Sequence, residues 1–490
     1  MPALRIAIVH YHLRPGGVTR VIQHAVSALR GARYRVAVLT GHSPDAESFL
    51  PGEVHIVPGL DYPQSGTSGQ TASLLFDTLK ATAQKALGGP PDIWHFHNHT
   101  LGKNTALSQA VYQLALRGQK LLLQIHDFPE DGRPANYHAL IKDIGAGNPA
   151  LLASRLYPQA NHVHYATINS RDRAFLCQAG MPEPHVHLLP NAIDLGHIKA
   201  MQTMPSNESE RLFVYPTRAL RRKNLGEFLL WSALARQGDR FATTLAPTSP
   251  ADRSSYQQWV ALARQLKLPV TFEIGRTSPL PFSTLLASAT AIITTSVAEG
   301  FGLAFLEPWL VKRPLVGRDL PEITGDFKTH LVRLDGLYRR LLIPSDWINL
   351  DIFRHKIKVG YSRWLSAYKR PETKQVAELA FKAALQGDRI DFGRLDEALQ
   401  QSVVRRLKSS AVMRSEICPA RLFGAAPSPP VIIQNRAAIR RIYGPDRYRR
   451  QLERLYTLIG KSGSGKLVAI SGDVLLDRFL APDRFYLLRT

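Results

Sequence analysis

Apolar positions along the chain fall into short runs that alternate with longer segments of helical spacing. Leu4 to His10 is apolar enough for a buried strand, and Val18 to Leu29 has the three- and four-residue apolar spacing of an amphipathic helix. Further strands are predicted at residues 35–40, 54–57, 92–97, 120–126, 162–169 and 185–189. Such alternation is typical of a parallel, doubly wound α/β sheet.

The same alternation starts again after residue 208. Strands are predicted at residues 212–216, 241–246, 269–274, 291–296 and 313–317, and a helix at 225–235. The polar segment 201–209 is a predicted linker. We therefore predict an α/β fold with one Rossmann-like domain over residues 1–200 and a second over 208–335, facing a cleft. A mostly helical, basic extension follows over 336–490, and part of it is expected to cross back to the first domain.

Composition narrows the class of protein. The 490 residues are 44% apolar and 21% charged, which is typical of a globular protein, and no apolar run approaches the ~20 residues that span a bilayer. No charged leader precedes an apolar segment at the N-terminus, so a cytoplasmic location is expected. The cysteines Cys177 and Cys418 provide neither a disulfide framework nor a metal cluster.

The net charge of +23 is unevenly distributed, because residues 401–490 hold 17 Lys and Arg against 6 Asp and Glu. A basic surface favours nucleotide phosphates, acidic lipid headgroups or nucleic acid as partners, although it can also be a solvated face. Residues 439–458 form a predicted basic amphipathic helix, interrupted at Gly444-Pro445. This tail is a candidate for peripheral contact with the inner membrane face. It contains no recognised RNA or DNA module, so no nucleic-acid partner is expected.

Polar residues follow three predicted strands of the first domain, where α/β folds bind ligands. A glycine turn lies between the first strand and helix, and clusters of histidine, asparagine and aspartate end two later strands. Polar side chains at strand ends are typically substrate contacts. Zinc is the weaker interpretation of the histidines, because no Cys or Glu completes a ligand set. The residues concerned are Gly16, Gly17, His95, His97, Asn98, His99, His126 and Asp127.

In the second domain, Arg218 and Lys223 follow a strand and precede a helix. A diphosphate at this position would contact both cations and the helix N-terminus. Because Arg221 and Arg222 lie between them, a surface charge run is the alternative interpretation.

The segment from Glu299 to Glu307 follows the predicted strand at 291–296. Phe301-Gly302-Leu303 is predicted to form a tight turn at a helix N-terminus, whose amides can donate to anionic or hydroxyl-rich ligands. On a helix, carboxylates eight positions apart are separated by ~12 Å. That is too far for acid and base at one bond, but it suits two ends of an elongated ligand.

Residues 460–466 match most of a phosphate-binding loop, Gly-x4-Gly-Lys. Leu467 replaces the hydroxyl residue that would meet magnesium, and a predicted helix precedes the segment instead of a strand. A flexible connector is therefore predicted here.

Taken together, these residues resemble glycosyltransferase family 4, the retaining nucleotide-sugar transferases of GT-B fold, over roughly residues 4–330. The resemblance is carried by Gly16-Gly17, His126-Asp127, residues 189–194 (Leu-Pro-Asn-Ala-Ile-Asp), Arg218 with Lys223, Glu299-x7-Glu307 and Pro321-Glu322-Ile323. Two positions depart from the family pattern: Ala192 stands where glycine is usual, and Pro308-Trp309 replaces the small residues that usually follow Glu307.

The resemblance implies a role for each matched residue. Glu307 would accept from the nucleotide ribose, while Glu299 and the amides of Phe301, Gly302 and Leu303 would hold the donor sugar. Arg218 and Lys223 would neutralise the diphosphate as the glycosidic bond breaks. Gly16 and Gly17 would let the N-terminal loop approach the phosphates, His126 would lie over the donor sugar, and His95, His97, Asn98 and Asp127 would be on the acceptor side.

The implied enzyme moves a hexose from UDP, GDP or ADP to a hydroxyl of a small molecule, saccharide or lipid-linked acceptor. It would retain configuration by a front-face path, with no metal and no other cofactor. A nucleotide-sugar epimerase or a phosphorylase on the same fold is the alternative. The alternative of another class is a basic protein that binds nucleic acid or a membrane surface.

Overall fold

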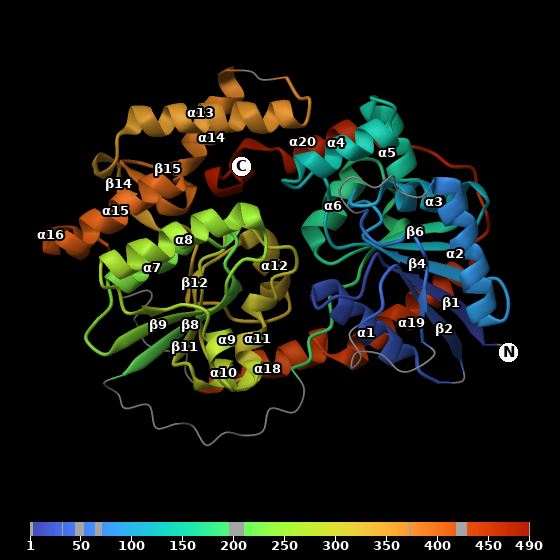
Figure 1. Cartoon of the computed structure of the whole chain (residues 1–490), viewed down its shortest axis with the longest axis horizontal. Coiled ribbons are helices and arrows are strands. Elements are labelled where there is room, and N and C mark those ends of the chain that lie inside the picture. The colour runs from blue at the N-terminus through green and yellow to red at the C-terminus, as the bar shows by residue number, and fades with distance from the viewer. Residues whose placement is uncertain are drawn as a thin grey trace. The chain divides into compact units, whose positions relative to one another are not determined.

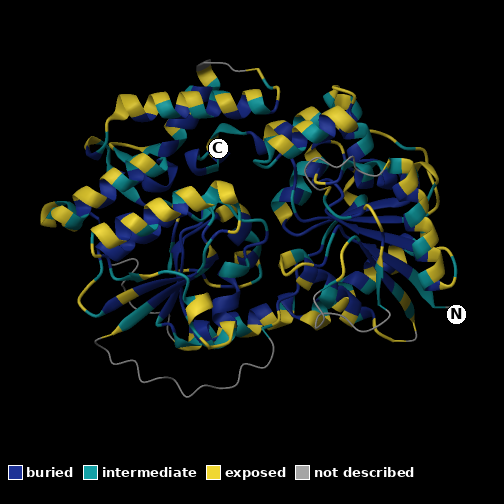
Figure 2. Cartoon of the chain, in the orientation of Figure 1, coloured by how far each residue is buried: buried dark blue, intermediate teal, exposed yellow. Residues whose placement is uncertain are grey.

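The computed structural model describes residues 3–31, 33–44, 53–63, 71–195, 210–371, 374–417 and 429–489. It divides the chain into two compact units: residues 1–192 with 443–481, and residues 193–442 with 482–490. The predicted linker at 201–209 and Cys418 lie outside the described residues. Figure 2 shows the central strands of both sheets mostly in the colour of buried residues, with exposed residues on the outer faces of the helices.

The first unit contains a seven-stranded sheet in the order β3-β2-β1-β4-β5-β6-β7 (Figure 1). All its strand pairs are parallel, which confirms the doubly wound arrangement. Its strands are β1 Leu4–Val9, β2 Tyr34–Thr40, β3 Val54–Ile56, β4 Ile93–His97, β5 Leu121–Ile125, β6 Val163–Thr167 and β7 Val186–Leu188. Its helices are α1 Gly17–Leu29, α2 Ala72–Leu87, α3 Thr105–Leu116, α4 Pro134–Asp143, α5 Pro149–Leu156, α6 Ser170–Gln178, η1 Glu183–His185, α19 Pro445–Lys461 and α20 Gly472–Phe479.

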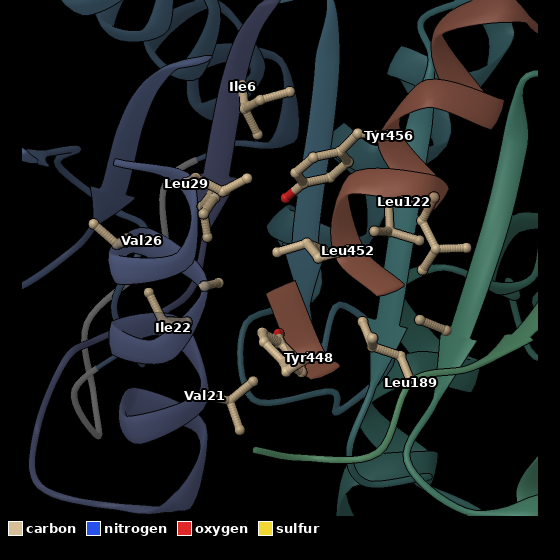
Figure 3. Close-up of a cluster of buried hydrophobic side chains, with 14 of the residues drawn as sticks. Ile6, Val21, Ile22, Val26, Leu29, Leu122, Leu189, Tyr448, Leu452 and Tyr456 are labelled. Carbon is tan, nitrogen blue, oxygen red and sulfur yellow. The ribbon is translucent and has the colours of Figure 1, made fainter. Parts of the chain in front are cut away.

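Helix α19 completes the hydrophobic core of the first unit (Figure 3). Its buried side chains Tyr448, Leu452 and Tyr456 pack with Ile22 of α1 and Ile6 of β1 in one cluster. Burying a Leu-sized side chain contributes about 1.5–3 kcal/mol, so the helix is a substantial part of this core. The apolar face of the predicted basic amphipathic helix is therefore used inside the protein, and its interruption at Gly444-Pro445 separates α19 from α18 Pro429–Tyr443.

The second unit contains a parallel sheet in the order β10-β9-β8-β11-β12-β13. Its strands are β8 Arg211–Arg218, β9 Asp239–Leu245, β10 Val270–Thr271, β11 Ala291–Thr294, β12 Leu315–Arg318 and β13 Leu337–Tyr338. The helices of this part are η2 Arg221–Lys223, α7 Leu225–Ala233, α8 Pro250–Gln265, α9 Ile274–Thr277, α10 Phe282–Ser288, η3 Leu303–Phe305, α11 Glu307–Leu310 and α12 Pro321–Thr329.

Residues 337–410 are mostly helical, as expected for the extension, but they also contain short strands. Besides β13, they contain an antiparallel sheet in the order β14-β16-β15, formed by β14 Leu342–Pro344, β15 Leu385–Gln386 and β16 Arg389–Asp391. These strands have two or three residues each, too few to show a period-2 pattern in the sequence. The surrounding helices are η4 Ser345–Trp347, α13 Leu350–Ala367, α14 Lys374–Ala384, η5 Phe392–Arg394, α15 Glu397–Ser409, α16 Ala411–Glu416, and at the C-terminus η6 Pro482–Arg484 and η7 Leu487–Arg489.

Among the described residues, no helix is both long enough and apolar enough to cross a lipid bilayer.

The segment 460–466, which resembles a phosphate-binding loop in sequence, does not have the geometry of one. Helix α19 ends at Lys461, and residues 462–467 run without regular structure to a single bridge between Gln159 and Val468. A phosphate-binding loop requires a strand before it and a helix after it. The prediction of a connector is confirmed.

Candidate active site

In the second unit, Lys223 and Glu299 meet at the carboxyl ends of the neighbouring central strands β8 and β11. Lys223 Nζ donates to the Glu299 carboxylate, and the two side chains are only 14% and 10% exposed. Ser296 Oγ donates to the same carboxylate at 2.6 Å, and Arg222 Nη1 lies 3.6 Å from its other oxygen. The ion pair is therefore largely shielded from solvent and held in place by its neighbours.

Both partners of this pair have shifted pKa values. Burial would raise the pKa of Glu299, but the charges of Lys223 and Arg222 and the hydrogen bonds to Glu299 outweigh it and lower the pKa. Burial lowers the pKa of Lys223, and the attraction of Glu299 opposes that shift. A buried carboxylate with a lowered pKa is ionised at neutral pH.

The backbone carbonyl of Lys223 is held from two sides. Tyr215 OH and Thr295 Oγ1 each donate to it at 3.0 Å. Tyr215 also lies 3.1 Å from Ser296 Oγ, so the hydroxyl groups that hold Lys223 and Glu299 are joined to each other. Preorganised charges of this kind are what stabilises a developing anion in a reaction.

Arg218 ends strand β8 after an irregularity in the pairing with β9 between Tyr215 and Arg218. Pro216 lies within this stretch and cannot donate a ladder hydrogen bond, which is typical of a bulge in a central strand. Among the residues that the structure describes, none bonds or ion-pairs with the exposed Arg218 guanidinium. The exposed cation can therefore take an anionic ligand without losing a protein partner.

The segment from Phe301 to Glu307 differs from the predicted continuous helix. Gly302 is left-handed (φ 86°), η3 covers Leu303 to Phe305, and α11 starts afresh at Glu307. The reason is Pro308, which has no N–H for a helical bond and is tolerated only in the first turn. A Cβ on Gly302 would lie 2.8 Å from the Phe305 ring, so the turn requires glycine. Glu299 and Glu307 are thus not on one helix, and the ~12 Å estimate does not apply.

In the first unit, the carboxyl ends of β1, β4 and β5 bring histidines together. His97 Nδ1 lies 2.9 Å from His126 Nε2 and the rings are stacked, while His10 Nδ1 lies 3.2 Å from the His97 carbonyl. Burial lowers the pKa of His126 to about 4 and that of His10 to about 3, so these rings are neutral at pH 7. Neutral imidazoles can each donate one hydrogen bond and accept another.

Asn98 shapes the loop that carries His126. It is left-handed (φ 56°), and its Oδ1 accepts from the backbone N–H groups of His126 and Asp127 at 2.7 and 3.0 Å. Asp127 is half-exposed and forms an ion pair with Arg133. Asn98 therefore positions its neighbours, and its carboxamide oxygen is used within the protein.

His95 was expected at the ligand-facing end of its strand, and the structure corrects this. Its side chain is fully buried, with Nδ1 2.8 Å from Tyr456 OH and Nε2 3.0 Å from Gln124 Oε1. It lies on the same face of β4 as His97 but two residues further from the strand end, where it contacts Tyr456 of α19. The described residues contain no group of three His, Cys, Asp or Glu side chains that could hold a metal ion.

Gly16 and Gly17 lie at the start of α1 and are exposed. A Cβ added at Gly17 would meet nothing within 4 Å, and one at Gly16 would meet only the Arg14 carbonyl at 3.8 Å. The fold itself leaves this loop open on its surface.

Residues 15–197 match the family model described as Glycosyltransferase Family 4. This match supports the resemblance to the family over the first unit. The chain is 27% identical over 426 residues to mannosylglucosyl-3-phosphoglycerate synthase of Petrotoga mobilis, a match that covers 80% of the chain and 79% of the relative.

Similarity to solved structures shows the fold of the chain. Anabaena HepE in complex with UDP and glucose matches with a TM-score of 0.53 and 12% identity, over 93% of the chain and 99% of HepE. Sucrose-phosphate synthase of Thermosynechococcus elongatus matches with a TM-score of 0.53 and 14% identity, over 93% and 98%. The predicted GT-B fold is confirmed.

Several residues around the candidate site were missed in the sequence. Tyr215 contacts Ser296 across 81 positions, which no local pattern reveals, whereas Ser296 lies only three positions before Glu299. His10 could have been found, because it directly follows the first strand as His126 follows the fifth. Arg222, set aside as part of a surface charge run, lies beside Glu299.

Proposed function

We propose that this glycosyltransferase transfers a hexose from a nucleotide sugar to a hydroxyl acceptor with retention of configuration and without a metal ion. The observation that carries the proposal is the Lys223–Glu299 pair at the ends of β8 and β11, together with the exposed Arg218 at the end of β8. Cations there suit a diphosphate, and an ionised carboxylate suits sugar hydroxyls. Glu307 is assigned to the ribose.

Bond breaking is the step that these groups assist. As the bond from the anomeric carbon to the diphosphate breaks, negative charge grows on the leaving oxygen, and Arg218 and Lys223 neutralise it. Glu299 holds the sugar hydroxyls through hydrogen bonds, together with the amides of Phe301, Gly302 and Leu303. The acceptor hydroxyl attacks on the face that the diphosphate leaves, and its proton passes to the departing diphosphate oxygen.

Residues of the first unit are proposed to bind the acceptor and to contact the donor sugar. His126 would contact the donor sugar, and His97, Asn98 and Asp127 would form the acceptor side. Gly16 and Gly17 leave the room that a phosphate needs to approach the backbone. The product named for the Petrotoga synthase suggests an anionic acceptor such as a glucosyl phosphoglycerate, which suits a chain with net charge +23.

The test combines binding and turnover. UDP-, GDP- and ADP-hexoses are screened for a rise in melting temperature, and release of nucleoside diphosphate is then measured with and without a glucosyl phosphoglycerate acceptor. Glu307→Ala should weaken donor binding and Lys223→Ala should mainly slow transfer, while the exposed Lys267→Ala serves as the matched control. Wild-type rates in both site variants would refute the assignment.

The same assay separates the alternatives. An epimerase would interconvert the donor sugar without an acceptor, and a phosphorylase would require inorganic phosphate as the acceptor. Retention is read from the anomeric configuration of the product by NMR, and metal independence from activity that persists after treatment with a chelator.

The basic tail could contact a membrane only through its exposed surface. The apolar face of α19 is buried, whereas Arg449, Arg450 and Arg454 on the same helix are exposed. Apart from the exposed Leu458, α19 then offers a membrane mainly electrostatic attraction to anionic lipid, at about 1 kcal/mol per basic residue near the surface. Sedimentation with anionic but not neutral vesicles, lost on Glu substitution of these three arginines, would support it, and no sedimentation with either would refute it.

A further inference from the structure

We propose that Gln400 is a positioning residue for Lys223, and that residues 342–409 brace the donor-binding loop through it. The inference rests on the proposed function, because Lys223 is taken there to bind the donor diphosphate. Gln400 lies on α15, 176 positions from the residue that it contacts, and is fully buried.

The contact is made to the residue that directly follows Lys223. Gln400 Nε2 donates to Asn224 Oδ1 at 2.9 Å and to the Phe392 carbonyl at 3.1 Å. Both partners are acceptors, so the orientation of the amide group is fixed by its surroundings. Gly226 on α7 makes this approach possible, because a Cβ there would lie 2.1 Å from Gln400 Oε1.

Asn224 links Gln400 to Lys223, because it accepts the hydrogen bond from Gln400 and directly follows Lys223 in the chain. It is left-handed (φ 53°, ψ 58°), a conformation that non-glycine residues rarely adopt, and it links η2 to α7. Its side chain is also fixed by Nδ2, which donates to Glu227 Oε2 at 2.8 Å. A strained linker persists only when its surroundings determine it, and here Gln400 and Glu227 hold the two ends of one carboxamide.

A second connection runs in parallel. Arg318 of β12 donates to Glu227 at 2.5 Å and to Asp391 of β16 at 2.7 Å, and all three side chains are buried. Residues 342–409 therefore contact the segment that follows Lys223 in two ways. Gln400 donates a hydrogen bond to Asn224, and Asp391 is joined to Glu227 through Arg318. This assigns a role to residues that lie outside the part of the chain resembling the family.

The experiment uses the full chain with UDP, GDP and ADP as probes, measured by titration calorimetry at 25 °C. Gln400→Met keeps the volume and removes both hydrogen bonds, so the Kd of the diphosphate that binds the wild type should rise about tenfold. Gln401→Met, the same change at the next position of α15, should leave it unchanged. Asn224→Gly removes the same bond from the other side, keeps the left-handed backbone, and should weaken binding similarly.

A double variant separates positioning from general stability. If Gln400 acts through Asn224, Gln400→Met should change the Kd less than twofold in an Asn224→Gly background, while still lowering the melting temperature through its lost bond to Phe392. An unchanged Kd in both single variants, or a full tenfold loss in that background, would overturn the inference. A wild-type chain that binds none of the three diphosphates would overturn the proposed function as well.

Discussion

Replacing Glu299 by Gln should tighten the binding of a free nucleoside diphosphate. In the free protein, Glu299 occupies Lys223, so an incoming diphosphate has to compete with this carboxylate for the cation. The amide of Gln has nearly the same shape and can still accept from Ser296, but it carries no charge. The variant would leave Lys223 beside Arg222 with excess positive charge, which favours an anion.

The size of the effect follows from the burial of the pair. Two unit charges about 4 Å apart attract by about 4 kcal/mol at an effective dielectric constant of ~20. The pair is shielded from solvent, but the diphosphate also has to lose its own water on binding. We therefore expect a net gain of about 1.4–2.8 kcal/mol, a ten- to hundredfold lower Kd.

Calorimetric titration with UDP, GDP and ADP tests this expectation, together with turnover of the nucleotide sugar. Glu299→Gln should bind the diphosphate more tightly but transfer sugar more slowly, because the carboxylate for the sugar hydroxyls is gone. Glu210→Gln, which neutralises an exposed carboxylate paired with Arg240, is the matched control. Equal or weaker diphosphate binding by folded Glu299→Gln would refute competition for Lys223.

Two further predictions concern the buried polar groups. Arg318→Met should destabilise the second unit by about 3–5 kcal/mol, because it leaves Glu227 and Asp391 as buried carboxylates without a counter-charge. In the wild type, burial acts to raise the pKa of Asp391, but the charge of Arg318 outweighs burial and the pKa is lowered. Without Arg318, burial alone should raise the pKa of Asp391 above its unfolded value of about 3.8. The loss of unfolding free energy caused by Arg318→Met should therefore grow as the pH rises above about 4. Urea unfolding at pH 5 and pH 7.5 measures this loss, and equal losses at the two pH values would contradict the prediction. His97→Phe keeps the stacked ring but removes the hydrogen bond to His126, so transfer should slow about tenfold with the donor Kd unchanged; a wild-type transfer rate would show that His97 does not position His126.

Sequence patterns predicted the elements that local residues determine. The strand and helix around Gly16 were found because apolar spacing and a glycine turn mark them, and the break at Gly444-Pro445 was found for the same reason. The continuous helix after Gly302 was a wrong prediction, although Pro308 already argued against it. Short strands such as β14 and β16 carry no pattern of their own, because long-range pairing alone creates them.

The candidate site was predictable in kind but not in its connections. Lys223 and Glu299 were each selected by their place after a strand, whereas their ion pair joins residues 76 positions apart. Helix α19 shows the same limit for hydrophobic faces. A basic amphipathic sequence suits a membrane surface and a protein core equally well, and only the packing of Tyr456 against β4 and α1 decides between them.

The ion pair also has a consequence for the order of binding and release. A free diphosphate can replace Glu299 as the partner of Lys223, but it leaves the buried carboxylate with Arg222, 3.6 Å away, as its remaining charged neighbour. An intact nucleotide sugar supplies both the anion for Lys223 and hydroxyl donors for Glu299, so neither charge is left unpaired. We therefore expect the pair to favour the donor over the diphosphate that transfer releases. Once the sugar has left, Glu299 can reclaim Lys223 and help to expel the product.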